Sequence, residues 1–200
     1  YKFLKRIGIQ YHWVNNSFND FSDFLSSMKS RKKKTIIKER KFLKDQGVSF
    51  SSKEGDMIDE EDIKNLYSCY LNTIEKKWSR PYLNFEFFKG LINSNSDKKV
   101  LLISAYKHKK LLGCSIHFVG NEILYGRYWG CTENVPYLHF ELCYYQAIEY
   151  AIKNKLKKVE AGAQGEHKIS RGYLPNLTYS NHWFNNEALA GPIRDFLEKE

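Results

Sequence analysis

The spacing of apolar residues changes half-way along the chain, and this change constrains the fold more than any other feature of the sequence. Over residues 100–106, 111–119 and 122–128, apolar side chains recur with a period of two, which is typical of strands with one buried face. Turn-like residues separate the three segments, at 108–110 and at 120–121. The pattern therefore predicts a three-stranded antiparallel meander.

The residues that follow the meander predict a crossover connection. Pro136 breaks the chain, and from 138 to 156 apolar residues recur every three or four positions, which indicates a helix packed on a sheet. A strand is predicted immediately afterwards, at 158–161. Such a connection places the strands 122–128 and 158–161 parallel, so that their carboxyl ends open onto one cleft.

The remaining segments complete a single mixed α/β (α+β) domain that spans residues 1–200. A hydrophobic fraction of 42% is sufficient for one core, and no apolar run is long enough to span a membrane. The other predicted helices cover 36–43 before Gly47, 59–78 before Pro81, a short segment after Asn84, and 187–200; the other predicted strands cover 48–52 and 179–184.

Basic residues are concentrated between Lys29 and Asp45, where nine lysines and arginines oppose two acids. Ile36, Ile37 and Leu43 form the predicted buried side of this segment and leave a basic outer face. That face is either an ordinary solvated surface or a site for a polyanion such as tRNA, a nucleotide-sugar precursor or anionic lipid. Lysine outnumbers arginine, whereas nucleic-acid recognition favours arginine, and no DNA partner is expected.

The four cysteines form no C-x-x-C pair and suggest no disulfide framework, which is typical of free thiols in the cytoplasm. His139 and Cys143 stand four residues apart on a predicted helix, but two ligands do not make a zinc site. The sequence therefore predicts a cytoplasmic protein without a metal centre.

Two glycine-containing loops follow the parallel strands, at 126–133 and 162–172. Functional loops of such sheets lie beyond the carboxyl ends of the central strands. Glycines such as Gly126 and Gly130 would let a ligand approach the main chain, whose N–H groups could stabilise a carbonyl oxygen as it becomes negative. The same glycines would also serve as ordinary turn residues.

The second of these loops is the densest polar segment of the chain. Glu166 or His167 could accept a proton from an attacking amine, while Lys168 and Arg171 could hold phosphate or carboxylate. The competing interpretation is an exposed loop held by salt bridges.

The start of the long helix adds two candidates, because His139 and Glu141 are expected to face the same cleft. A glutamate at this position is also ordinary helix N-terminal electrostatics. The sequence contains no G-x-S-x-G elbow and no G-x-x-x-x-G-K-[ST] loop, so neither a hydrolase of the first type nor a P-loop enzyme has local support.

Six blocks of residues resemble the FemAB-like family of peptidoglycan biosynthesis or recognition proteins. They run through nearly the whole chain, and the last three are long and chemically unusual. The blocks are Tyr11-His12-Trp13; Arg31-Lys32-Lys33-Lys34 with Glu39-Arg40; Lys77-Trp78 with Pro81-Tyr82-Leu83; Leu124-Tyr125-Gly126-Arg127-Tyr128-Trp129-Gly130; Leu138-His139-Phe140-Glu141 with Cys143-Tyr144-Tyr145; and Gly162-Ala163-Gln164-Gly165-Glu166-His167-Lys168 with Arg171-Gly172.

The resemblance implies a fold of the GNAT acyl-CoA acyltransferase superfamily. Such a fold has a mixed central sheet with helices on both faces, and a splayed pair of parallel strands admits the acyl donor. Members of the family are longer than this chain, which resembles their C-terminal half. The implied activity is transfer of an acyl or aminoacyl group to an amine of a peptidoglycan precursor. The implied donor is aminoacyl-tRNA or an acyl-CoA such as acetyl-CoA, and no tightly bound cofactor is implied.

The resemblance also implies roles for the candidate residues. Glu166 or His167 would deprotonate the amine, and Glu141 is a third catalytic candidate. GNAT pyrophosphate loops read [QR]-x-x-G-x-[GA]. Arg127 and Gly130 match this pattern, but Thr132 breaks it and the acidic Glu133 follows, which disfavours CoA. The residues expected to bind donor or acceptor are Arg127, Trp129, Gly130, His139, Gln164, Lys168 and Arg171.

A non-catalytic module on the same fold is the alternative function. It would recognise cell-wall fragments through aromatic residues such as Trp129, Tyr144, Tyr145 and Trp183. Packing in the core is the other interpretation of these rings. Affinity for a donor would indicate the enzyme, and affinity for muropeptides alone would indicate the module.

Overall fold

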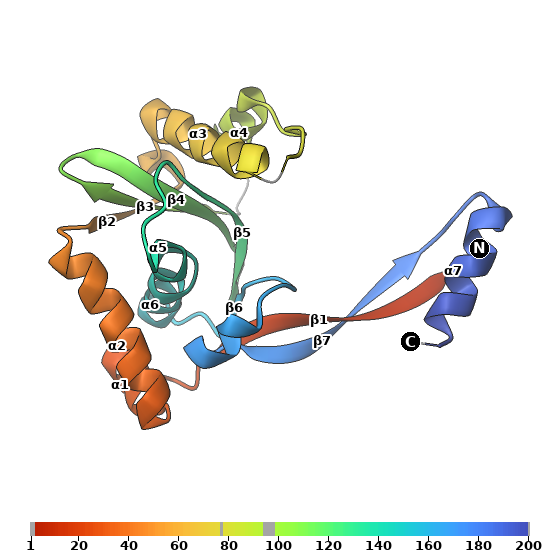
Figure 1. The fold of residues 1–200 in the computed structure, drawn as a ribbon, viewed down its shortest axis with the longest axis horizontal. Coiled ribbons are helices and arrows are strands. Elements are labelled where there is room, and N and C mark those ends of the chain that lie inside the picture. Colours follow the sequence, from red (N-terminus) through yellow and green to blue (C-terminus); the bar gives the residue numbers. More distant parts are fainter. Residues whose placement is uncertain (1–2, 77, 94–98, 200) are drawn as a thin grey trace.

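The computed structural model describes residues 3–76, 78–93 and 99–199, which form a mixed seven-stranded sheet with helices on both faces (Figure 1). The strand order is β2-β3-β4-β5-β6-β1-β7. The strands are β1 (Leu4–Val14), β2 (Ser49–Glu54), β3 (Lys99–Lys107), β4 (Lys110–Val119), β5 (Ile123–Cys131), β6 (Lys158–Glu160) and β7 (Leu174–His182). The helices are α1 (Phe21–Ser26), α2 (Ser30–Asp45), α3 (Glu60–Lys76), α4 (Phe85–Asn93), α5 (Leu138–Phe140), α6 (Gln146–Lys153) and α7 (Glu187–Leu197). Short turns of 3₁₀ helix, η1 (Gly55–Met57) and η3 (Glu166–Arg171), and a π-helical turn, η2 (Glu141–Tyr145), complete the elements.

The predicted meander and crossover are confirmed. Strands β3, β4 and β5 pair antiparallel in sequence order, and β5 pairs parallel with β6 after the helical segment formed by α5, η2 and α6. The period-two pattern explains this arrangement, because alternate residues of one strand enter different cores. In β3, Leu101 and Ile103 pack toward α1, α2 and α6, while Val100 and Leu102 pack toward α3 and α4.

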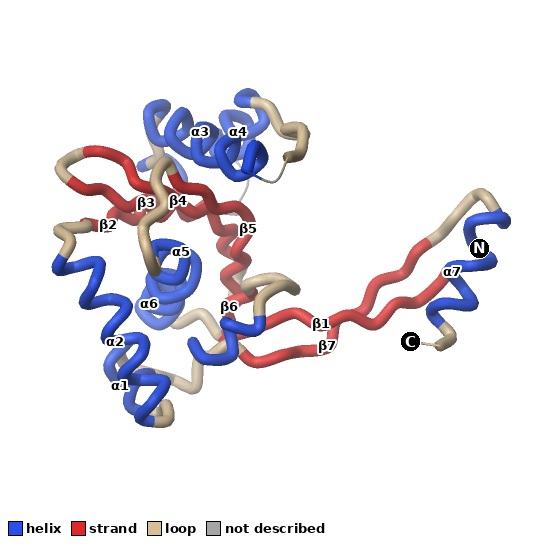
Figure 2. The backbone as a smooth tube through the Cα atoms, in the orientation of Figure 1, coloured by secondary structure: helices blue, strands red, loops and turns tan. Residues whose placement is uncertain are grey.

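A two-stranded ribbon extends the sheet away from this body (Figures 1 and 2). Along most of its length β1 pairs with β7, and it meets β6 only from His12 onward. The helix α7 lies at the far end of the ribbon. The sequence pattern does not predict β1, and it predicts the last strand at 179–184, whereas β7 starts at Leu174. Apolar side chains of this ribbon, such as Ile7 and Tyr179, are exposed, so burial imposes no alternating pattern here.

The lysine-rich segment forms the helix α2 as predicted, but its buried side differs from the expected one. Ile36 and Leu43 are buried, whereas Ile37 is 46% exposed. The third buried position is occupied by Glu39, a carboxylate that enters the core because it has partners there. The remaining faces of α2 carry most of its lysines, which leaves the predicted basic surface open to solvent.

Candidate functional site

The strands β5 and β6 part at the centre of the sheet. They pair only from Ile123 to Tyr125, after which the chain beyond β6 follows β1 instead: the Ala161 N–H donates to the Tyr11 carbonyl at 3.0 Å. At the same place β5 contains a bulge, because the pairing with β4 shifts by one residue at Arg127. The predicted splayed pair is therefore present, and one edge of β5 faces the gap.

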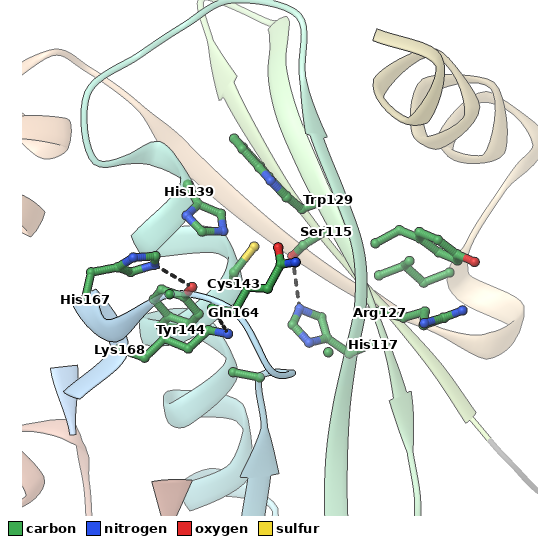
Figure 3. Close-up of a pocket in the computed structure, with 15 residues that line it drawn as sticks. Ser115, His117, Arg127, Trp129, His139, Cys143, Tyr144, Gln164, His167 and Lys168 are labelled. Carbon is green, nitrogen blue, oxygen red and sulfur yellow. Dashed lines mark hydrogen bonds between the residues drawn. The ribbon is translucent and has the colours of Figure 1, made fainter. Parts of the chain in front are cut away.

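A cavity of about 420 Å³ occupies the place where the two strands diverge (Figure 3). Its wall combines three histidines, the Lys168 ammonium and several aromatic rings, and among the described residues no aspartate or glutamate lines it. The lining residues are Ser115, Ile116, His117, Gly126, Arg127, Tyr128, Trp129, His139, Cys143, Tyr144, Ala161, Gln164, Gly165, His167 and Lys168. Of the predicted site residues, six lie together here: Arg127, Trp129, His139, Gln164, His167 and Lys168.

His167 and Tyr144 form a hydrogen-bonded pair at the wall of the cavity. The His167 Nε2 atom lies 3.0 Å from the Tyr144 hydroxyl. Burial lowers the pKa of His167, with further contributions from Arg171 and Lys168, while burial raises the pKa of Tyr144. The pair is therefore a neutral imidazole beside a protonated phenol near neutral pH, which suits it to exchange protons.

The backbone of Gly165 makes room for this histidine. Gly165 has a φ of +99°, and a Cβ atom there would lie 2.3 Å from the His167 ring. Both conditions exclude other residues at this position. The sequence predicts that glycines in this loop let a ligand approach the main chain. At Gly165, the group that approaches the main chain is the His167 ring.

The π-helical turn η2 and the residues just before it form the helix side of the cavity. Just before it, the His139 ring packs at a tilt against Trp129 with ring centroids 4.6 Å apart, and within it Cys143 and Tyr144 reach the cavity. A π turn widens a helix locally and changes the direction of the side chains that follow, and such turns recur at functional sites. Burial lowers the pKa of His139 to about 4, so this imidazole is neutral at pH 7.

Lys168 and Arg171 lie in the same 3₁₀ turn but differ in their surroundings. The Lys168 ammonium lines the cavity and donates to the carbonyls of Gly162 and Gln164, and burial lowers its pKa. Arg171 does not line the cavity: it is 6% exposed and forms an ion pair with Glu39. Its Nη1 also donates to the His167 carbonyl at 2.8 Å. Arg171 is thus placed to position His167 rather than to bind a ligand in the cavity.

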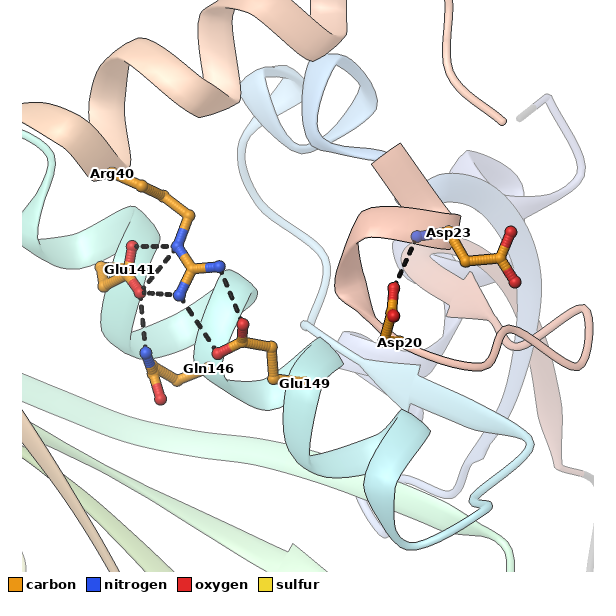
Figure 4. Close-up of polar contacts among 6 residues, drawn as sticks. All are labelled: Asp20, Asp23, Arg40, Glu141, Gln146 and Glu149. Atoms are coloured by element: carbon orange, nitrogen blue, oxygen red, sulfur yellow. Dashed lines mark hydrogen bonds and ion pairs between the residues drawn. The ribbon is translucent and has the colours of Figure 1, made fainter. Parts of the chain in front are cut away.

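The structure places the two candidate glutamates outside the cavity. Glu141 is buried on the far side of its helix, where it accepts hydrogen bonds from Arg40 at 2.9 Å and from Gln146 at 2.8 Å (Figure 4). The expectation that it faces the cleft with His139 is wrong, because residues two positions apart on a helix point in different directions. Glu166 is exposed and does not line the cavity.

Gly130 and Arg127 lie inside β5 and not in a loop between strand and helix. Gly130 pairs with Cys114 and faces α3, and a Cβ atom on it would lie 1.9 Å from the Cys69 carbonyl oxygen. The glycine therefore serves the packing of α3, which corrects the expectation that it admits a donor. Arg127 points to the other side of β5 from His139 and Lys168 (Figure 3), with its guanidinium 4.8 Å from the Tyr128 ring centre.

The cavity residues that were not predicted as site residues include Ser115, His117, Cys143 and Tyr144, of which Tyr144 was named only as a possible recognition ring. Two of them had a recognisable signal. Ser115 and His117 occupy alternate positions of a strand that is otherwise apolar on its buried faces, and both are 1% exposed. Polar residues are rarely buried without a partner or a role, so these two positions could have been singled out.

Two neutral histidines of the cavity, His117 and His139, predict a pH-dependent stability. Burial lowers the pKa of both His117 and His139 from 6.5 to about 4. Their contribution is complete above pH 6.5, and it is lost as the pH falls toward 4, because the unfolded chain gains protons first. We expect the unfolding free energy to fall by about 3 kcal/mol per histidine across this window. Urea titrations at several pH values check this, and replacing His117 with Gln should remove its share of the slope.

Comparison with known proteins identifies the family. The profile of the FemAB-like family, described as peptidoglycan biosynthesis/recognition, matches residues 1–200. The chain belongs to the FemAB-like family. No curated protein matches its sequence. The sequence resemblance is therefore confirmed over the whole length of the chain.

Solved structures show that this FemAB-like chain has a GNAT-like fold. L-PGS from Bacillus licheniformis matches with a TM-score of 0.65 and 8% identity, covering 96% of this chain and 65% of that chain. FemX matches with a TM-score of 0.60 and 10% identity, covering 93% and 64%. A tandem GNAT protein from the clavulanic acid biosynthesis pathway matches with a TM-score of 0.52 and 10% identity, covering 90% and 55%. The FemAB-like chain thus spans less than two thirds of the length of each.

Two further observations concern the described part of the FemAB-like chain. None of its helices has the length and apolar character needed to cross a membrane. Its four cysteines are free, and no three His, Cys, Asp or Glu side chains within residues 3–76, 78–93 and 99–199 gather as metal ligands would.

Proposed function

We propose that this chain carries the catalytic cavity of an N-acyltransferase, which moves an acyl or aminoacyl group to an amine of a peptidoglycan precursor. The observation that carries the proposal is the His167–Tyr144 pair at the wall of a cavity between two diverging parallel strands. The family description and the GNAT-like fold support the same class of reaction.

In the proposed reaction the amine nitrogen attacks the donor carbonyl, and the bond from that carbon to the leaving atom breaks. The amine proton passes to His167, and Tyr144 supplies a proton to the leaving atom. Because the two groups are hydrogen-bonded at 3.0 Å, the imidazolium can return a proton to the phenol, which balances the exchange. Main-chain N–H groups on the open edge of β5 are candidates to stabilise the oxygen that becomes negative.

The geometry favours His167 over Glu166 as the base, since only the histidine lines the cavity. Lys168 would hold an anionic or carbonyl oxygen of the donor, although its two bonds to the loop carbonyls show that it also shapes that loop. Trp129 and His139 would contact the acyl group, because their rings pack against each other at the wall of the cavity.

We propose aminoacyl-tRNA as the donor rather than an acyl-CoA. The positions that match the pyrophosphate pattern, Arg127 and Gly130, lie within β5 and not in the turn that would cradle a pyrophosphate. That turn carries Glu133, whose carboxylate pairs with Lys110 and would oppose an anion. The exposed basic residues of α2 provide a surface of the sign that RNA requires.

The test compares two variants of the pair with a neighbouring control in the protein at its natural length. His167→Ala and Tyr144→Phe should each lower the rate of transfer from aminoacyl-tRNA to a muropeptide amine at least tenfold. Glu166→Gln, one residue away but outside the cavity, should stay within twofold of the wild type. Wild-type rates in both cavity variants would refute the assignment. Muropeptide affinity without any transfer from either donor would favour the recognition module.

The alternative function, a cell-wall recognition module, depends on four aromatic residues. Tyr144 and Tyr145 are buried, Trp129 lines the cavity, and Trp183 lies beyond the end of β7. These rings do not form one exposed platform, so the enzyme remains the function that we propose.

A further inference from the structure

The cavity contains one buried polar atom that has no partner. His117 is 1% exposed, and its Nε2 lies 3.0 Å from the Ser115 hydroxyl, but its Nδ1 meets no hydrogen-bonding group among the described residues. Buried polar atoms of folded proteins are nearly always hydrogen-bonded. An unpartnered atom on a residue that lines a cavity therefore marks a contact with something that enters the cavity.

The hydrogen bonds around His117 determine which of its nitrogens carries the proton. The Ser115 hydroxyl donates to the Leu142 carbonyl at 3.0 Å, and a hydroxyl has only one hydrogen. Toward His117 the hydroxyl can therefore only accept, so Nε2 carries the hydrogen. Burial lowers the pKa of this histidine to about 4, and a neutral imidazole has a single N–H. The unpartnered Nδ1 is consequently an acceptor without charge.

The position of Nδ1 relates it to the parting of the strands. A Cβ atom on Gly126 would lie 3.7 Å from Nδ1, so a side chain at this position would contact this edge of the ring. Gly126 follows the last pair between β5 and β6 and precedes the bulge at Arg127. The acceptor thus lies where the two strands separate.

The other polar groups of the cavity decide what this acceptor can bind. The Lys168 ammonium and the Trp129 indole are donors, whereas the Arg127 guanidinium points to the other side of β5, and no carboxylate among the described residues lines the wall. An ammonium ion would meet the Lys168 cation and no carboxylate of the described residues, which disfavours it. An uncharged amine avoids that repulsion, but its N–H groups need an acceptor.

We propose that His117 Nδ1 accepts a hydrogen bond from the uncharged primary amine of the acceptor substrate and holds the amine where β5 and β6 part. This inference rests on the proposed function and names a residue for its amine site. The hydrogen bond leaves the amine lone pair free to attack, and the proton released by the attack goes to His167. Ser115 is then a positioning residue, since it fixes the tautomer of His117.

The test uses two substitutions that each retain one nitrogen position of the imidazole. His117→Gln keeps a group near Nε2 that can meet Ser115 but removes the acceptor at Nδ1. His117→Asn keeps an acceptor near Nδ1 but loses the contact with Ser115. The probe is glycine methylamide at pH 9, about one unit above the pKa of an α-amine. The matched control ligand is N-methylpropanamide, in which a methyl group replaces the amine.

In protein labelled with ¹⁵N-histidine, the Nδ1 resonance of His117 should have the shift of an unprotonated nitrogen. It should move when glycine methylamide is added and stay in place with N-methylpropanamide. His117→Gln should weaken binding of the amine at least tenfold, whereas His117→Asn should remain within threefold of the wild type. Amide spectra establish that both variants fold, and the wild-type resonance decides the case if either does not.

Three results would overturn the inference. The first is a protonated Nδ1, and the second is an Nδ1 resonance that does not shift when glycine methylamide is added. The third is a ranking in which His117→Gln binds the amine with wild-type affinity and His117→Asn does not. The last ranking is that of a purely structural histidine. Failure of the proposed function is distinguishable from these results. Amine binding at His117 without any acyl transfer would refute the transferase alone, while transfer with a wild-type KM for the amine in His117→Gln would refute the amine site alone.

Discussion

Replacing Arg171 with alanine is expected to lower the unfolding free energy by about 3–5 kcal/mol, because it leaves a buried carboxylate without its cation. Arg171 and Glu39 are 6% and 4% exposed, and their closest atoms are 2.5 Å apart. Among the described residues, the hydrogen-bond partner that Glu39 would retain is the Tyr145 hydroxyl. The same arginine packs 3.4 Å from the centre of the Phe140 ring, so its loss also removes packing.

Two controls separate the buried charge from other effects of the substitution. Adding Glu39→Gln to Arg171→Ala removes the uncompensated charge and should recover a substantial part of the lost stability. Lys41→Ala breaks an ion pair of α2 whose partners are 68% and 56% exposed, and it should change stability by no more than about 1 kcal/mol. Urea unfolding of all variants supplies the values. A loss below 1 kcal/mol in Arg171→Ala would show that the pair does not stabilise the fold as its burial indicates.

This ion pair also connects the basic helix to the candidate site. Through Glu39 and Arg171, α2 is joined to the carbonyl of His167, and Lys32 donates to the Ile169 carbonyl at 3.0 Å. The 3₁₀ turn that carries His167 is thus held from outside the cavity by two residues of α2. Arg171→Ala is therefore expected to lower the transfer rate as well, through a His167 that is less well positioned.

The sequence could predict those parts of the fold in which burial imposes a regular pattern. The meander and the crossover are of this kind, because each strand or helix there has faces in a core. The ribbon of β1 and β7 has no such regular pattern, because Ile9 and Leu177 are more than half exposed and no core determines the spacing of its apolar residues. Pattern reasoning therefore missed one strand and shortened the other.

The sequence could also predict part of the candidate site, namely the residues whose place follows from the order of strands and helices. The polar loop with His167 and Lys168 could be found because it follows a predicted strand, whose end the topology places at the cleft. The prediction for Glu141 is wrong because residues two positions apart on a helix point in different directions. His139 faces the cavity, so Glu141 cannot. The sequence predicts only a core or recognition ring at Tyr144, because a hydrogen bond to a residue 23 positions away leaves no local pattern.

Gly130→Ala is expected to be strongly destabilising, with a loss of about 3 kcal/mol or more, because a methyl group there meets main-chain atoms that cannot move independently. Its Cβ would lie 1.9 Å from the Cys69 carbonyl oxygen and 2.8 Å from the Thr73 hydroxyl. Thr73 and Asn72 of α3 bind the carbonyls of Trp129 and Cys131 on either side of the glycine, which fixes the helix against β5. Relief of the clash would require α3 to withdraw from these contacts.

The matched control is Gly90→Ala in the exposed part of α4, where a Cβ would have no neighbour within 4 Å. Alanine favours a helix over glycine, so this variant should be as stable as the wild type or more stable by up to about 1 kcal/mol. Unfolding in urea compares the two. If Gly130 instead served to admit a donor to the main chain, Gly130→Ala would keep its stability and lose only ligand affinity. Because the carbonyl of Cys69 already occupies the space beside Gly130, we expect the opposite result, with stability lost first.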